Sequence, residues 1–308
     1  MLKFAVKRIL FIIPSIFIIT FVTFLIMSFS AGSPGSVALG ITATPEEIAE
    51  YNHAVGYDRP VLVRYADYML NALQGDFGES YSSGVPVVDL LMPKFPTTLK
   101  LALFAVLFSA LIGIPIGVLA AVKKGTIADT GTTVVSLVLA SIPGFWLGLL
   151  LLLLFSYQLG LLPPFGIGTW KHYVMPVATL AIPSSAYVAR MVRMTMLEAL
   201  SSDYVRTARA KGAGPGRIVF VHVLRNAMLP VITQLGMSFA GLLGGAVIAE
   251  QIFGMPGFGT AILEAINKKE TMIVLGATIF LSLLYMLIML AMDLINALLN
   301  PKIRDNMG

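Results

Sequence analysis

The sequence predicts an all-α protein that crosses a membrane several times. Of its 308 residues, 57% are hydrophobic and only 12% are charged, whereas soluble domains carry about 25% charged residues. The apolar residues gather in runs of about 20, the length that a helix needs to cross the hydrocarbon core of a bilayer. Cysteine is absent, which excludes disulfides and thiolate metal sites within the chain. An ordinary soluble fold is therefore excluded.

Six apolar segments are predicted to span the membrane. The first, Ile9–Phe29, follows Lys3, Lys7 and Arg8. It is longer than the apolar region of a cleaved signal peptide, about 7–15 residues, and lacks a clean small-residue cleavage site. We therefore expect it to stay as an uncleaved first span. The other five are Leu99–Val122, Val134–Leu159, Val174–Met194, Met228–Ala249 and Ile273–Leu299.

Charged residues are distributed unevenly between the two sides of these spans. With the N-terminus inside, fourteen of the 21 Lys and Arg residues lie on the cytoplasmic side and seven on the outer side. This bias follows the positive-inside rule. We therefore expect a multi-pass protein of the cytoplasmic (inner) membrane with both termini in the cytoplasm. The net charge of +5 then reflects topology. Membrane lipid is an expected partner and nucleic acid is not.

The chain is predicted to have three parts. Residues 1–96 hold the first span and one long outer segment, residues 97–300 hold the other five spans, and residues 301–308 form a cytoplasmic tail. Within the outer segment, a short amphipathic helix is predicted because apolar residues recur at helical spacing, and three glycines then mark an irregular connection. The helix signal comes from Val61, Tyr65, Tyr68 and Met69, and the glycines are Gly75, Gly78 and Gly84.

Glycines four residues apart occur twice within the spans. Gly113 and Gly117 lie in "GIPIG", and Gly241 and Gly245 lie in "GLLGG". Small residues at this spacing allow close helix packing. The alternative is a glycine-rich face that lines a path or slides during gating, and the sequence alone leaves both open.

Residues for catalysis or metal binding are not recognisable. No G-x-x-x-x-G-K-[ST] phosphate loop and no set of nucleophile and base occurs, so we expect a non-enzymatic chain that binds no cofactor. His53, His172 and His222 lie in separate loops and predict no metal site. An ion-coupled carrier needs a buried relay of ionisable groups, and Asp293 is the main candidate. A membrane scaffold without a transport role is a third alternative.

The basic stretch "DYVRTARAKGAGPGRIVFVHVLRNAMLP" at 203–230 separates the fourth and fifth spans. Ser201, Ser202 and Asp203 are good N-caps for a short helix over 204–211. Ala208 and Gly212 give this helix a face almost without side chain, which a partner could approach closely. Contact with anionic lipid explains the charge equally well, so partner docking and lipid contact both stay open on physical grounds. The helix is predicted to stop at Gly212, Gly214, Pro215 and Gly216.

The same stretch resembles the cytoplasmic coupling loop of binding-protein-dependent ABC importer permeases, in the dipeptide/oligopeptide/nickel branch. The general family pattern is E-A-A, three residues, G, nine residues, then I-x-L-P. Alignment on Gly212 shows that the glutamate and the late proline are missing, a departure that this branch itself shows. "MLKFAVKRILFIIPSIFIITFVTFLIMSFSAGSPG", "GYDRPVLVRYADYMLNALQGDFGES", "GGAVIAEQIFGMPGFGTAILEAI" and "DLINALLNPKIR" are similar to the B-type permease subunit of that branch.

The resemblance implies a type I ABC importer permease fold with six transmembrane helices, a small extracytoplasmic insertion after the first helix, and a core domain over 97–300 with a coupling loop at 198–226. It implies four kinds of partner: a second homologous permease, two ABC ATPase subunits that bind ATP and Mg, a solute-binding protein, and lipid. Peptides are the expected cargo, with nickel or a metal chelate as the alternative cargo. A more distant alternative function is that of an ion-coupled carrier. The implied ATPase-docking residues are Arg206, Thr207, Ala208, Arg209, Ala210, Lys211, Gly212, Ala213, Gly214 and Arg217, and the expected gate or pore residues are Gly241, Gly245, Glu250, Pro256 and Gly257.

Overall fold

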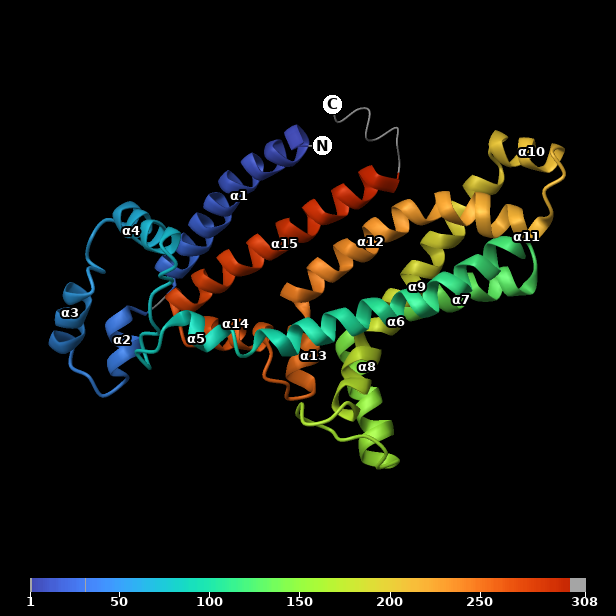
Figure 1. Cartoon of the computed structure of the whole chain (residues 1–308). Coiled ribbons are helices and arrows are strands. Elements are labelled where there is room, and N and C mark those ends of the chain that lie inside the picture. The colour runs from blue at the N-terminus through green and yellow to red at the C-terminus, as the bar shows by residue number, and fades with distance from the viewer. Residues whose placement is uncertain (1, 31, 300–308) are drawn as a thin grey trace. The chain divides into compact units, whose positions relative to one another are not determined.

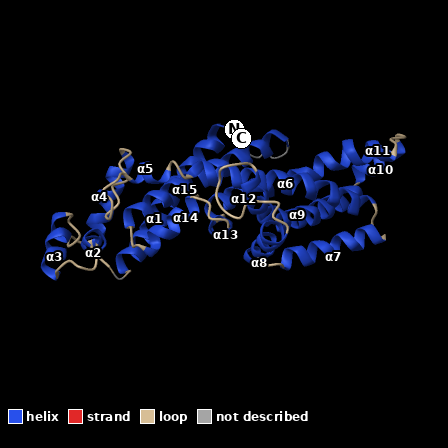
Figure 2. Cartoon of the chain, turned by 90° about the horizontal axis from the view of Figure 1, so that it is seen from below, coloured by secondary structure: helices blue, strands red, loops and turns tan. Residues whose placement is uncertain are grey.

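The computed structural model describes residues 2–30 and 32–299, and within these the regular elements are all helical (Figures 1 and 2). One isolated bridge joins Glu79 and Pro86. The helices are α1 (Leu2–Phe29), α2 (Pro34–Leu39), α3 (Pro45–Ala54), α4 (Val61–Leu73), α5 (Val87–Leu91), α6 (Phe95–Val122), α7 (Ile127–Ser141), α8 (Gly144–Leu151), the π-helix η1 (Leu152–Gln158), α9 (Lys171–Leu200), α10 (Asp203–Ala210), α11 (Pro215–Arg217), the π-helix η2 (Ile218–Val223), α12 (Leu224–Gly245), α13 (Val247–Ile252), α14 (Phe258–Asn267) and α15 (Thr271–Leu299).

The chain divides into two compact units. Unit 1 comprises Leu99–Met255 and the chain from Ile288 onward, whereas unit 2 comprises Leu2–Thr98 and Pro256–Leu287. Each unit has hydrophobic clusters of its own.

Unit 1 is organised around α9, which packs against α7, α8 and α12. Its 30 residues give a length of about 45 Å at the standard helical rise. Val188, Val192 and Met196 from α9 form a buried cluster with residues from α6, α10 and α12. Figure 1 shows α10 and α11 at one end of α9 and α12, opposite the end that carries α8 and α13.

Gly113 and Gly117 of α6 lie directly against α9. A Cβ atom at Gly113 would be 2.7 Å from the Ser185 carbonyl oxygen, and one at Gly117 would be 2.5 Å from that of Ala189. Both distances are shorter than a side chain tolerates, so only glycine allows this approach. The close-packing interpretation of "GIPIG" is therefore confirmed. Gly241 of "GLLGG" has no such neighbour within 4 Å.

The predicted third span, Val134–Leu159, is wrong as a single straight helix. The helix begins earlier, at Ile127, and breaks at Ile142 and Pro143, where α7 and α8 meet at an angle of 94°. Ile142 is extended, with a ψ of 124°, because a residue before proline is pushed out of the α region.

The predicted fifth span, Met228–Ala249, differs at both ends. Helical structure runs continuously from Pro215 to Gly244. Pro230 lies inside α12 and does not begin it. A turn at Ala246 then separates α12 from α13, which holds Glu250.

All six predicted segments are helical, but they differ in apolar character. Three described helical stretches are long and apolar enough to cross a membrane: Phe95–Val122, Pro215–Gly244 and Thr271–Asn296. The bent pair Ile127–Ser141 and Gly144–Gln158 is a fourth if it counts as one span. A shorter apolar stretch in α1 covers Ile13–Phe29, and α9 is long but less apolar.

Unit 2 contains the amphipathic helix that the sequence predicts, as α4. Tyr68 and Met69 are buried with Phe24 of α1 and Leu275 of α15. Tyr65 donates a hydrogen bond of 2.8 Å to the Phe17 carbonyl of α1. The three glycines that follow α4 all have positive φ, which fits the irregular connection predicted there.

A capping box begins α3. The Thr44 hydroxyl accepts from the Glu47 backbone N–H at 3.3 Å, and the Glu47 carboxylate accepts from the Thr44 N–H at 2.8 Å. This pattern satisfies two backbone donors at the helix start.

Candidate functional site

The basic stretch begins with the short helix α10, which has one buried side chain. Val205 of α10 has no exposed surface and belongs to the same cluster as Met196 of α9 and Ile218 of η2. Ala213, just after α10, packs against that cluster. A push on α10 would therefore reach α9 and the helix that follows η2 through packed side chains.

The ends of α10 agree with the prediction to within one residue. Ser202 is the N-cap residue, but no side chain caps the helix start. The Ser202 hydroxyl instead donates to the Ala199 carbonyl at 2.5 Å, which satisfies the end of α9. At the other end Gly212 has a φ of +81°, a conformation that glycine adopts at low cost.

The small-residue face of α10 is open. Positions Gly212, Gly214 and Gly216 are exposed, and a Cβ atom at any of them would meet no atom within 4 Å. Ala210 is exposed, whereas Ala208 is partly buried. The part of this face that is available to a partner is therefore Ala210 and the glycines that follow α10.

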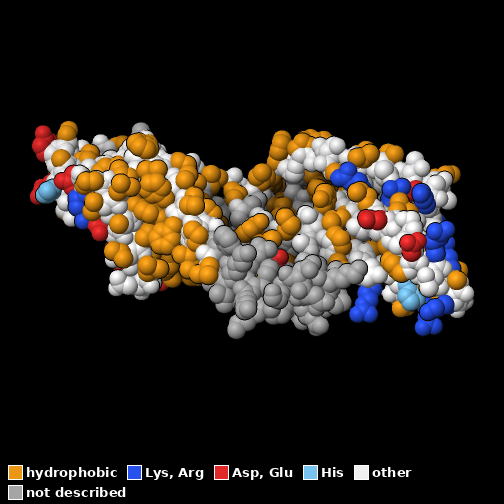
Figure 3. Space-filling view, turned by 90° about the horizontal axis from the view of Figure 1, so that it is seen from above, with side chains coloured by type: hydrophobic (Ala, Val, Ile, Leu, Met, Phe, Trp, Pro, Cys, Tyr) orange, Lys and Arg blue, Asp and Glu red, His pale blue; other side chains and the backbone are white. Residues whose placement is uncertain are grey.

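Cationic side chains surround the open face. Figure 3 shows Lys and Arg side chains gathered over the end of unit 1 that carries α10 and α11. The pairing of Arg206 with Asp203 is loose, at 3.8 Å, and both side chains are exposed. The Arg206 charge is therefore available to acidic groups of a partner. The exposed cations of this end are Lys123, Lys124, Arg206, Arg209, Lys211, Arg217 and Arg225.

A cavity of about 580 Å³ lies beside α10 and α11. Its wall includes Leu197, Leu200 and Ile218, while Lys124 and Arg209 also line it. The apolar wall with two cations gives a partner side chain a place to insert. This cavity could not be predicted from the sequence, because its walls come from α6, α9 and the loop around α11.

An ion pair missed by sequence reasoning supports the same end of unit 1. Asp129 of α7 pairs with Arg193 of α9 through both carboxylate oxygens, the second at 3.1 Å from Arg193 Nη2. Asp129 also accepts the Gly125 N–H at 2.9 Å. Arg193 therefore links two helices. The available signal was the opposite charges near the ends of two helices that follow one another along the chain.

The expected gate residues fall into different parts of the structure. Gly241, Gly245 and Glu250 belong to unit 1, and Glu250 is fully buried in α13. Pro256 and Gly257 belong to unit 2, where Gly257 is the N-cap of α14. The segment "FGMPGFG" is a packed turn: Phe253, Met255 and Phe258 are each at most 2% exposed.

The helical fold includes several apolar helices long enough to cross a membrane, and comparison with known families identifies the class of membrane protein. Residues 113–305 match the family described as "Binding-protein-dependent transport system inner membrane component". Residues 1–102 match the N-terminal model described as "Binding-prot-dependent transport system membrane comp, N-term". The chain belongs to this family.

Two relatives match along nearly their whole length. The chain is 37% identical to the di/tripeptide transport system permease protein DppB of Pseudomonas aeruginosa (strain UCBPP-PA14), over 99% of each chain. It is 36% identical to the glutathione transport system permease protein GsiC of Escherichia coli (strain K12), again over 99% of each. Both relatives are named as permeases of transport systems.

Solved structures show the same fold. A chain of the MetNI methionine ABC transporter in an inward-facing conformation aligns with a TM-score of 0.55 and 22% identity, covering 68% of this chain and 96% of that one. An amino acid ABC transporter aligns with a TM-score of 0.53 and 20% identity, covering 70% and 94%. The type I ABC importer permease fold predicted from the sequence is confirmed.

Proposed function

We propose that this chain is the membrane-spanning permease subunit of an ATP-driven importer that carries peptides across the cytoplasmic membrane. The observation that carries the proposal is the open, basic, small-residue face of α10, held to α9 by the buried Val205. The di/tripeptide and glutathione systems of the two relatives support peptides as the class of cargo. Nickel or a metal chelate is the alternative cargo.

The proposed topology has six spans and both termini in the cytoplasm. The fourteen-to-seven bias of Lys and Arg supports this orientation. In this topology the six spans are the three long apolar helices, the bent pair α7 and α8, and the helices α1 and α9. α9 needs less apolar surface than a lipid-facing helix, because its neighbours bury much of it. The segment 31–96 is then extracytoplasmic, and residues 97–300 form the permease core.

The proposed complex contains this chain, a second homologous permease, two ABC ATPase subunits and a solute-binding protein. ATP and Mg are bound by the ATPases, so the chain itself catalyses nothing. The coupling loop 198–226 docks α10 on one ATPase, where Arg206, Arg209 and Lys211 set register and partner choice. Closure of the ATPases moves α10, and Val205 passes the motion to α9 and α12.

The outer gate is proposed to involve the glycine-rich part of α12 and the turn after α13. Gly241 has open space around it, which allows a helix to slide past. The packed turn around Pro256 and Gly257 would then stay fixed while the glycine-rich part of α12 moves.

Affinity purification tests the proposal. The tagged chain is extracted in mild detergent, its co-purifying chains are identified by mass spectrometry, and the complex is reconstituted with its solute-binding protein and labelled dipeptides or Ni²⁺. We expect two ATPases and a second permease, with ATP-dependent dipeptide uptake. A chain that purifies alone and moves solute without ATP would contradict the proposal, and uptake of Ni²⁺ in place of dipeptide would select the alternative cargo.

A further inference from the structure

A polar cavity of about 210 Å³ lies within unit 2, between the end of α1, α4 and the start of α15. Three cationic and two acidic side chains line it: Arg59, Arg64 and Lys269, with Asp67 and Asp76. The lining therefore carries a formal excess of one positive charge. Cavities for whole small molecules measure about 300–1,000 Å³, so this one fits a single functional group or the end of a longer solute.

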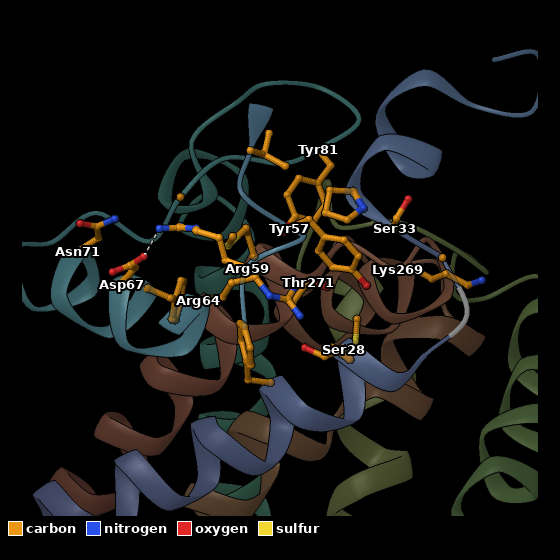
Figure 4. A pocket seen from close by; sticks show the side chains of 18 of the residues that line it. Ser28, Ser33, Tyr57, Arg59, Arg64, Asp67, Asn71, Tyr81, Lys269 and Thr271 are labelled. Atoms are coloured by element: carbon orange, nitrogen blue, oxygen red, sulfur yellow. Dashed lines mark ion pairs between the residues drawn. The ribbon is translucent and has the colours of Figure 1, made fainter. Parts of the chain in front are cut away.

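The two carboxylates already have partners, and neither of these partners is Arg64. Asp67 pairs with Arg59 at 2.7 Å, and Asp76 accepts the Gly78 N–H at 2.8 Å. Arg64 has neither a hydrogen bond nor an ion pair from its side chain to any residue that the structure describes. Figure 4 shows Arg64 reaching toward the middle of the pocket beside Tyr57, whereas Arg59 turns to Asp67.

Aromatic rings hold the Arg64 guanidinium in place. Its central carbon lies 4.3 Å from the Tyr57 ring centroid and 5.6 Å from that of Phe24. Stacking of this kind fixes the plane of the guanidinium while leaving its N–H groups free to donate. The geometry is that of an arginine pre-oriented for an acceptor.

A second buried donor lines the same cavity. Tyr68 is 5% exposed, and its hydroxyl, like Arg64 Nε, is buried without a hydrogen-bond partner among the described residues. Burial raises the pKa of the Tyr68 phenol, so the hydroxyl stays protonated. Buried donors without partners are rare in native structures and call for an occupant.

We propose that this cavity is a carboxylate-binding site, in which Arg64 and Tyr68 donate to one carboxylate group. One negative charge balances the excess positive charge of the lining, and two donors match two carboxylate oxygens. Lys269, which also lines the cavity, adopts a φ of +60°, an unusual conformation outside glycine. The choice of a peptide terminus as the natural source of the carboxylate rests on the proposed function.

The test is NMR titration of the full-length chain in detergent, with 15Nε-labelled arginine. The probes are acetate, the dipeptide Ala-Ala, its C-terminal amide and inorganic phosphate. We expect the Arg64 Nε signal, assigned from its loss in Arg64→Lys, to shift saturably with acetate and Ala-Ala but not with the amide or phosphate. No saturable shift, equal shifts with the amide, or a response to phosphate alone would overturn the proposal.

Two variants separate binding from folding. Tyr68→Phe removes only an unpartnered hydroxyl, so the fold should be retained while Ala-Ala binds about tenfold more weakly, the loss of one hydrogen bond to a charged group. Lys268→Gln, the matched control, replaces an exposed lysine that does not line this cavity, so it should leave the Arg64 response unchanged. Unchanged affinity in Tyr68→Phe contradicts the proposed role of its hydroxyl. Because no transport is measured, this result does not depend on whether the complex imports peptides.

Discussion

Replacement of Glu270 should release the loop that it holds. The Glu270 carboxylate is 2% exposed and accepts four hydrogen bonds: from Ser80 Oγ at 3.0 Å, Tyr81 N at 2.8 Å, Ser82 N at 3.0 Å and Ser82 Oγ at 2.5 Å. Nearly 190 residues of sequence separate the two sides of this contact, so one side chain fixes the loop to the turn before α15.

The magnitude follows from the donors that lose their acceptor. A hydrogen bond to a charged group contributes about 1.5–3 kcal/mol, but the four are not additive, and water can reach the partly exposed loop. Counting the two backbone donors gives about 3–5 kcal/mol for Glu270→Ala. Glu270→Gln keeps the volume and one acceptor, and should cost about 2 kcal/mol.

Amide hydrogen exchange at Tyr81 and Ser82 measures this cost directly. At fixed pH the two amides should exchange more than about a hundredfold faster in Glu270→Ala and about thirtyfold faster in Glu270→Gln, since about 1.4 kcal/mol corresponds to tenfold. Glu264→Gln, an exposed position on α14, is the matched control and should leave both rates unchanged. Unchanged exchange at Tyr81 and Ser82 in Glu270→Ala would refute the reasoning.

Three further predictions concern other contacts. Gly117→Leu should lower the free energy of unfolding by about 2–3 kcal/mol, because its side chain would overlap the Ala189 carbonyl; thermal denaturation that matches the unsubstituted chain would argue against this packing. Arg193→Met should lower the unfolding midpoint of unit 1 by leaving the Asp129 carboxylate unpaired, and adding Asp129→Asn should recover most of the loss; a double variant no better than the single one would exclude the pairing as the cause. Hydrogen bonds from the Thr44 backbone and side chain hold the pKa of Glu47 below its usual value. The stabilisation by these hydrogen bonds is therefore present above the usual pKa and lost as pH falls through the lowered pKa. Exchange protection of the Thr44 amide should therefore fall as pH drops through this lowered pKa, and Glu47→Gln should remove that pH dependence; an unchanged pH profile in Glu47→Gln would contradict the assignment.

Local sequence signals predicted the bounds of α10 well. Its start and end agree to within one residue, because the residue preferences of a helix start and the glycine at its end act over one helical turn. The helix α4 was predicted from apolar spacing for the same reason. Close packing of Gly113 and Gly117 was one of two interpretations of their spacing, and the partner helix was not predicted.

The bend at Pro143 could not be predicted from proline alone. Proline removes one backbone donor and disfavours the α region before it, yet neighbouring helices decide whether a break follows. At the other prolines that lie inside helices, the helix continues without a break. These are Pro14, Pro115, Pro176, Pro183 and Pro230.

Contacts between distant residues could not be assigned from the sequence alone. Asp129 and Arg193 are 64 residues apart, and the cavity that Arg64 and Tyr68 line is built from separate helices, among them α1, α4 and α15. Such sites depend on how helices meet, and a single sequence does not contain that information in its local pattern.

The central claim, that α10 couples an ATPase to the membrane pathway, is tested most directly by substrate-driven ATP hydrolysis in the reconstituted complex. Gly212→Trp places a large side chain on the open face, and Gly212→Ala is the control that carries the backbone strain of a φ of +81° without the bulk. We predict that hydrolysis stimulated by the loaded solute-binding protein is lost in Gly212→Trp, through uncoupling or disassembly, and is largely retained in Gly212→Ala. Full stimulation in Gly212→Trp would contradict the account.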